Sequence, residues 1–210
     1  MIETLARWYS DGGPFMGVIL GVMALAVAVS LERLIFYYLI CKRKGTVLVS
    51  ELARSLNDNK IEQARNLLSR GKDPKTMLLK TALERFDAGM SIEEIQEGLE
   101  EEAIKQVPRL SQRLNYLTLF ANIATLLGLL GTITGLQLSF SSLANVEAAK
   151  KAAMLASGIS QAMLTTAFGL IVAIPCMVIY TFLYNKQSQL VKDLDEATVK
   201  FLNYLKKKKS

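Results

Sequence analysis

The chain has 210 residues, of which 51% are apolar, and its mean hydropathy of +0.27 indicates an integral membrane protein rather than a soluble domain. Its formal net charge of +6 comes from basic residues that flank apolar stretches without interleaved aromatic residues, so the composition does not favour nucleic-acid binding. The chain has no histidine and only two cysteines, Cys41 and Cys176, so we expect no metal site, no histidine-based active site and no disulfide framework.

The first apolar stretch, residues 14–40, follows a short segment of mixed charge, residues 1–13, and predicts transmembrane helix 1. It is too long for the apolar part of a signal peptide, and a basic cluster follows it like a stop signal. Glu32 and Arg33 lie near its end and, as sequence neighbours on a helix, are not expected to face each other. Two interpretations stay open: the pair lies in the headgroup region, or one of the two residues pairs with another subunit.

Residues 41–113 are rich in charge and predict a cytoplasmic helical region. Within it, Asp73-Pro74 predicts a capped helix start, and Ser91 with Glu94 predicts a capping box. The helix after Ser91 is expected to run past Pro108, with a kink there, directly into the second span.

Two stretches without any charge, residues 114–146 and 152–185, predict transmembrane helices 2 and 3. Residues 147–151 predict a short periplasmic turn between them. Most of the 25 Lys and Arg residues lie in two segments, residues 42–113 and residues 186–210. The positive-inside rule therefore places the N-terminus in the periplasm, and the middle region and the tail in the cytoplasm.

The tail, residues 186–210, is predicted to continue helix 3 as an amphipathic cytoplasmic helix. Its apolar stripe recurs every three or four residues at Leu190, Leu194, Ala197, Phe201 and Leu205. The sequence thus predicts an all-α integral membrane protein with three transmembrane helices, of which helices 2 and 3 extend into the cytoplasm.

Both charge-free helices carry a narrow face of small residues, which lets helix backbones approach closely in lipid. These faces consist of Gly128, Gly131 and Gly135 on the second helix and of Ala162, Gly169 and Ala173 on the third. They are either ordinary packing faces or the wall of a polar path through the membrane.

A threonine lies on each small face, Thr132 on the second helix and Thr166 on the third. Each is about 15 residues from the predicted turn, so the two are expected at one depth near the middle of the membrane. A hydroxyl can donate and accept hydrogen bonds, whereas a proton relay through a membrane usually needs an ionisable group. Since neither stretch contains one, a proton carrier would have to come from another chain.

Residues 126–135 read LLGLLGTITG and residues 164–175 read LTTAFGLIVAIP. These stretches resemble the signatures LLGLLGTVxG and (A/T)TAxGLxxAIP of the MotA/TolQ/ExbB proton-channel family. Glu32-Arg33 resembles the Glu-Arg pair that closes the first helix of that family. The resemblance is greatest to ExbB and TolQ, because MotA-type stators have four spans.

The resemblance implies a homopentameric ring in the bacterial inner membrane, surrounding the single helices of a dimeric ExbD/TolR-type partner. That partner would carry the proton-binding aspartate, and Thr132 and Thr166, which match the family threonines, would face it. Ion flow would rotate the ring relative to the dimer and drive a periplasmic or outer-membrane process. TonB-linked uptake, Tol-Pal envelope maintenance and gliding machinery all fit this expectation equally well.

The chain departs from the family pattern at three positions. Gln161 stands where ExbB has a glutamate, so a titrating role is lost there, and Thr125 stands where the family often has proline. Thr165 replaces a common alanine and adds a hydroxyl beside the expected ion path, which leaves Na⁺ open as an alternative to H⁺. The further candidates for pore lining or ion selectivity are Thr165, Gln161, Ser139 and Thr134, and Pro175 is expected to kink helix 3.

The leading hypothesis is therefore the channel-ring subunit of an ion-driven motor that needs no cofactor beyond its coupling ion. The alternative is a non-conducting membrane scaffold that uses the small faces only to oligomerise. An enzyme is not expected, because no acid, base and nucleophile cluster in the sequence.

Overall fold

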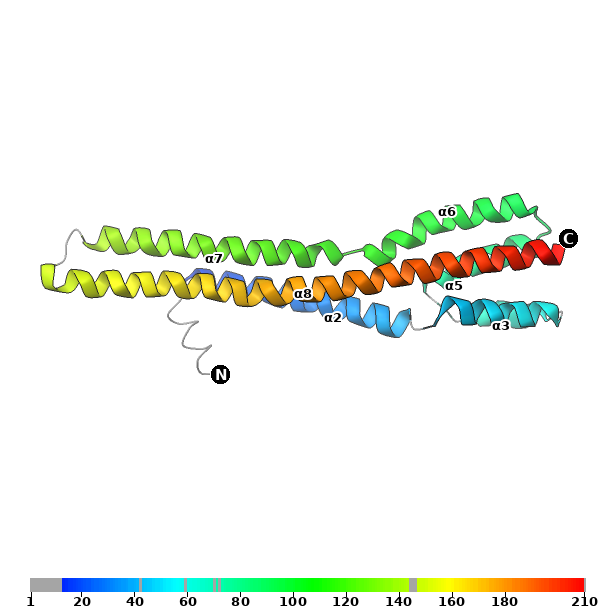
Figure 1. The fold of residues 1–210 in the computed structure, drawn as a ribbon, viewed down its shortest axis with the longest axis horizontal. Helices are drawn as coiled ribbons and strands as arrows, with labels where there is room; N and C mark the ends of the chain where they lie inside the picture. The colour runs from blue at the N-terminus through cyan, green and yellow to red at the C-terminus, as the bar shows by residue number, and fades with distance from the viewer. Residues whose placement is uncertain are drawn as a thin grey trace. The chain divides into compact units, whose positions relative to one another are not determined.

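The computed structural model describes residues 13–41, 43–58, 60–69, 71, 73–143 and 147–209, and the regular structure in these residues is entirely helical (Figure 1). The predicted all-α fold is confirmed. The helices are α2 (Phe15–Ile35), the π-helix η1 (Phe36–Ile40), α3 (Gly45–Asn57), α4 (Ile61–Ser69), α5 (Pro74–Asp87), α6 (Ile92–Ser111), α7 (Leu114–Ser142) and α8 (Ala148–Lys209).

Three helical stretches are long and apolar enough to cross a membrane, as the sequence predicted. They lie within Phe15–Asn57, Ile92–Ser142 and Ala149–Lys209. The predicted N-terminal segment except Gly13, residues 144–146 of the predicted second span, and Ser210 lie outside the described residues.

The chain forms two compact units. The first comprises residues 1–31 and 113–182 and contains most of α2, all of α7 and the first part of α8. In it α7 and α8 run side by side in opposite directions (Figure 1). Their outward faces carry large exposed apolar residues such as Leu126, Leu138, Met163 and Ile174. A helix that is apolar on all sides is typical of a membrane span.

The second unit comprises residues 32–112 and 183–210, including the last part of α8. Asp73 caps α5 by accepting a hydrogen bond from the Thr76 backbone amide at 3.3 Å. Ser91 and Glu94 form the predicted capping box at the start of α6. The apolar stripe of the tail is buried, as predicted: Leu190, Leu194, Ala197, Phe201 and Leu205.

Two boundaries differ from the sequence prediction. Ala148 to Lys151, assigned to a turn, form the first turn of α8, because two alanines favour helix and Lys150 lies 3.8 Å from Glu147. The helix through Pro108 does not continue into the second span. It ends at Ser111, and Arg113 takes a left-handed conformation with φ 65° before α7 begins.

Pro175 lies inside α8, which continues unbroken to Lys209. Pro108 likewise lies inside α6, one turn before its end. Proline removes one backbone donor, so each of these helices lacks the hydrogen bond to the carbonyl four residues before its proline.

Candidate functional site

The small faces of α7 and α8 lie against each other within one chain. A Cβ placed on Gly128 would lie 3.1 Å from the Thr166 Cα atom, and one on Gly135 would lie 3.1 Å from the Ala162 Cβ atom. A Cβ on Gly169 would lie 2.6 Å from the Ala124 carbonyl oxygen. Backbones this close leave no room for larger side chains, so the packing interpretation of these faces applies inside the chain.

Sequence reasoning missed one member of this contact. A Cβ on Gly158 would lie 1.5 Å from the Ser139 hydroxyl oxygen. The Ser139 side chain therefore fits between the helices only because residue 158 is a glycine. Gly158 stands four residues before Ala162 and therefore on the same helix face, which was the available signal. Ala173 extends the contact face in the other direction and is buried.

The hydroxyl of Thr166 joins the two helices directly. It donates a hydrogen bond of 2.8 Å to the carbonyl oxygen of Gly128, 38 residues earlier in the chain. The Thr132 hydroxyl donates to the Leu129 carbonyl oxygen of its own helix at 2.6 Å. Gly128 and Thr132 are four residues apart, which is about 6 Å of helix rise. The structure therefore brings the two threonines to within about one helical turn in depth.

Both hydroxyl protons are thus committed to backbone carbonyls. Each oxygen keeps lone pairs that can accept a further hydrogen bond. Thr132 and Thr166 are both partly exposed, so the pair borders the exposed surface beside the helix contact. Chemically, this pair can receive a proton donor.

Thr165 lies inside the contact between α7 and α8. Its side chain is 2% exposed, and its methyl carbon lies 2.3 Å from where a Cβ on Gly131 would be. Its hydroxyl donates to the Gln161 carbonyl oxygen at 3.1 Å. Within the chain the side chain is therefore enclosed between α7 and α8, and a pore role for Thr165 stays a prediction.

The remaining polar candidates divide into two groups. Ser139 is 8% exposed and donates to the Gly135 carbonyl oxygen at 2.7 Å, so it belongs to the helix contact. Thr134 is partly exposed and donates within α7, to Leu130 at 3.0 Å. Gln161 is exposed, and its Nε2 atom lies 3.0 Å from the Cβ position of Gly13.

Arg33 and Tyr37 form a second cluster, in the unit that contains α6. Arg33 is 3% exposed; it donates to the Arg109 carbonyl oxygen at 3.2 Å and to Glu32 Oε1 at 3.1 Å. The Tyr37 hydroxyl donates to the Leu110 carbonyl oxygen at 2.5 Å. Together they take up two carbonyls at the end of α6, which explains why the helix can stop there.

This cluster corrects one expectation about the pair Glu32-Arg33 and narrows another. The two side chains do meet, because the long arginine side chain reaches back beside its neighbour. Arg33 is enclosed by its own chain, whereas the Glu32 side chain is 41% exposed, so a pairing with another subunit stays a prediction for Glu32. Tyr37 was missed, since a tyrosine at the end of a span reads as an interfacial anchor.

The chain is similar in sequence to known membrane proteins. Residues 70–196 match the sequence model of a family described as the MotA/TolQ/ExbB proton channel family. An ExbB-like biopolymer transport protein of Synechocystis is 33% identical over 189 residues, with 87% of each chain covered. The biopolymer transport protein ExbB of Salmonella typhimurium is 42% identical over 65 residues, 31% of this chain and 26% of that protein.

The solved structure of C. jejuni MotAB is similar in fold. The match has a TM-score of 0.64 at 21% identity, over 90% of this chain and 73% of that chain. At this identity the likeness concerns the fold alone.

Proposed function

Because this chain belongs to the MotA/TolQ/ExbB proton channel family, we propose that it is the channel-ring subunit of an inner-membrane motor driven by the proton motive force. The observation that carries the proposal is the hydrogen bond from Thr166 to the Gly128 carbonyl oxygen, where the charge-free stretches of α7 and α8 pack closely together. It supports a shared site because the Thr166 hydroxyl then lies about one helical turn from Thr132 along α7.

The missing charge points to a partner. The stretches Leu114–Ser142 and 152–185 contain no Asp, Glu, Lys, Arg or His. Proton transfer through a membrane usually uses an ionisable side chain inside it. We propose that an ExbD/TolR-type single-span protein supplies an aspartate, and that a homopentamer of this chain surrounds a dimer of that partner.

The hydroxyl pair suits such an aspartate in both protonation states. When the carboxyl group is protonated, its O–H donates to a threonine oxygen whose own proton is already committed to a carbonyl. When the carboxylate is ionised, a threonine hydroxyl turns away from its carbonyl and donates to the carboxylate instead. The exchange costs little because each state replaces one hydrogen bond by another.

The coupling ion in this proposal is H⁺. The alternative, Na⁺, rested on the extra hydroxyl of Thr165, and that hydroxyl lies between α7 and α8 rather than on an exposed face. The enclosed position of that hydroxyl supports H⁺ as the coupling ion. The basic residues support a periplasmic N-terminus and a cytoplasmic tail, and the work is delivered to the periplasm or outer membrane.

The test removes each hydroxyl while keeping side-chain shape. Thr132→Val and Thr166→Val are expected to lower proton uptake by membrane vesicles at least tenfold in the complex with its partner, with the subunit stoichiometry unchanged. Thr181→Val is the matched control, because Thr181 also donates to a carbonyl of its own helix, Met177, at 3.0 Å. Proton uptake that survives both substitutions, or a complex that falls apart, would favour the non-conducting scaffold.

A further inference from the structure

A second polar site lies in the unit formed by residues 32–112 and 183–210. It is a pocket of about 510 Å³ between the segment that follows η1, the start of α3 and the adjoining part of α8. Lys44, Thr46, Lys186 and Gln189 are among the side chains that line it. Pockets of about 300–1,000 Å³ commonly hold small ligands or ligand headgroups.

The pocket lies where two apolar stretches of the chain end. η1 closes the first one at Ile40, four residues before Lys44, and the third one ends at Asn185, directly before Lys186. The Lys186 Nζ atom lies 5.2 Å from the centre of the Tyr38 ring, so these two ends are neighbours within the unit. The ends of membrane spans lie at the level of the lipid headgroups, which carry the phosphate groups.

The acidic residues of the pocket are already engaged. Asp193 accepts from the Lys75 Nζ atom at 2.6 Å and from the Gly45 backbone amide at 3.1 Å. Lys75 is only 4% exposed, so this ion pair belongs to the pocket wall. Glu196 is paired with Lys200 on the same helix at 2.6 Å.

The wall is also tightly built. A Cβ on Gly45 would lie 2.7 Å from the Ala197 Cβ atom, so α3 can start this close to α8 only with glycine at that position. Lys75 also donates to the Arg43 carbonyl oxygen, which holds the segment before α3 in place. These contacts define a fixed wall rather than a loose surface of lysines.

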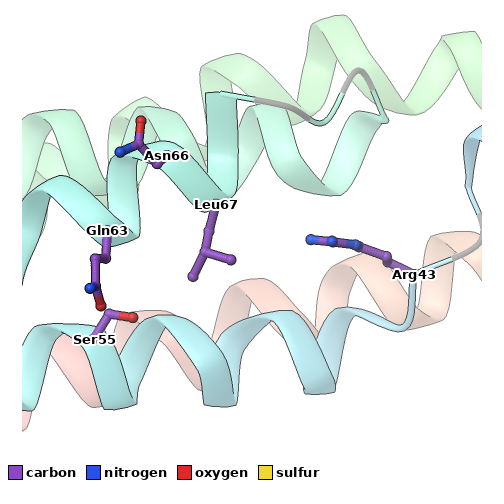
Figure 2. Close-up of a pocket in the computed structure, with 5 residues that line it drawn as sticks. All are labelled: Arg43, Ser55, Gln63, Asn66 and Leu67. Atoms are coloured by element: carbon purple, nitrogen blue, oxygen red, sulfur yellow. The ribbon is translucent and has the colours of Figure 1, made fainter.

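Two ammonium groups remain for a ligand. Within the described residues, no carboxylate lies within ion-pair distance of Lys44 or Lys186. Arg43 also lines this pocket, but Figure 2 shows its guanidinium directed towards a second pocket, of about 340 Å³, between α3 and α4. The pocket therefore offers two cations, a hydroxyl from Thr46 and an amide from Gln189, all of which can donate to phosphate oxygens.

We propose that this pocket binds a phosphate group, and that the phosphate belongs to the headgroup of an anionic membrane lipid. The two lysines neutralise the phosphate, and the apolar ends of the two stretches within the same unit, residues 36–40 and 183–185, meet the start of the acyl chains. A free phosphate would meet the same donors without this second contribution. The site is separate from the threonine pair and its occupancy does not require ion flow.

Native mass spectrometry of the full-length chain in neutral detergent tests this directly. The probes are dioleoylphosphatidylglycerol and dioleoylphosphatidylcholine, added at equal concentration. Wild-type protein is expected to retain the anionic lipid preferentially, and the double variant Lys44→Gln/Lys186→Gln to bind it roughly tenfold more weakly. The variant Lys44→Arg/Lys186→Arg retains both charges and is expected to bind like wild type.

The matched control is Lys80→Gln/Lys105→Gln, which changes the net charge equally at exposed positions outside the pocket. Equal loss of the anionic lipid in both glutamine pairs, or equal retention of the two lipids by wild type, would overturn the site. A further arm adds 10 mM inorganic phosphate. Displacement of the lipid by phosphate would contradict a lipid ligand, whereas continued retention supports it.

Discussion

The hydroxyl of Tyr37 donates a hydrogen bond of 2.5 Å to the carbonyl oxygen of Leu110. Leu110 is the next-to-last residue of α6, and its carbonyl would otherwise lack a partner once the chain turns at Arg113. Together with the contact from Arg33 to the preceding carbonyl, this hydrogen bond lets a helix end inside a buried environment. The end of α6 is thus determined by side chains that are more than 70 residues away in sequence.

Tyr37→Phe is expected to destabilise the end of α6. It removes the donor and leaves a buried carbonyl without its hydrogen bond, at a cost of about 1–3 kcal/mol. Hydrogen exchange of the amides in residues 105–112 should accelerate, with little change in the first turn of α6. Tyr38→Phe is the control, since Tyr38 is exposed. Unchanged exchange in the Tyr37 variant would show that the contact does not stabilise this helix end.

Gly131→Ala should weaken the contact between α7 and α8. The added Cβ would lie 2.3 Å from the Thr165 methyl carbon, and overpacking of this kind costs about 1–3 kcal/mol. The measurement is thermal unfolding of the protein in detergent. Gly21→Ala on α2 is the matched control, because nothing lies within 4 Å of its Cβ position.

The same steric conflict can be relieved from the other side. Adding Thr165→Ala to Gly131→Ala removes the conflicting methyl group and should recover part of the lost stability. If the two substitutions were simply additive, the contact between Gly131 and Thr165 would not be the cause of the loss.

Thr165→Val tests the choice of coupling ion. Valine keeps the shape of threonine and removes the hydroxyl that lies between the helices, so ion flow is expected to show the same dependence on H⁺ and Na⁺ as in wild type. Flux would be measured in vesicles at fixed pH with Na⁺ replaced by K⁺. An altered dependence of the flux on Na⁺ would show that the Thr165 hydroxyl contributes to the ion path.

The start of α6 should be sensitive to acid. Hydrogen bonds from the Ser91 backbone amide and, secondarily, its side chain hold the pKa of Glu94 below its usual value. The folded state therefore favours the ionised carboxylate. Its stabilising contribution is complete above the unfolded pKa, about 4.3, and is lost as pH falls through the lower folded pKa.

The corresponding measurement is amide exchange in the first turn of α6 between about pH 3 and pH 6, with rates corrected for intrinsic pH dependence. Protection should fall towards the acidic end in wild type, and Glu94→Gln should abolish most of this dependence. Glu93→Gln is the control, because Glu93 is in the same turn but not part of the capping box. Identical profiles for the two variants would contradict the role of the capping box.

Several features of this protein follow from the sequence by itself, because they depend on neighbours in the chain. Apolar length predicted the three membrane stretches, and Asp73 and Ser91 predicted the starts of α5 and α6 from residues within one turn. Spacing also predicted which residues share a small face, and the two family motifs identified the family.

The tertiary structure decided which of those residues meet. Spacing cannot set the register between two helices, so it could not tell that Thr166 reaches the Gly128 carbonyl while Thr165 is enclosed against Gly131. The partners of Tyr37 at the end of α6 and the meeting of Lys44 with Lys186 in one pocket are likewise contacts between distant segments. Local patterns specify helices and their faces, whereas the pairing of faces depends on how the whole set of side chains packs.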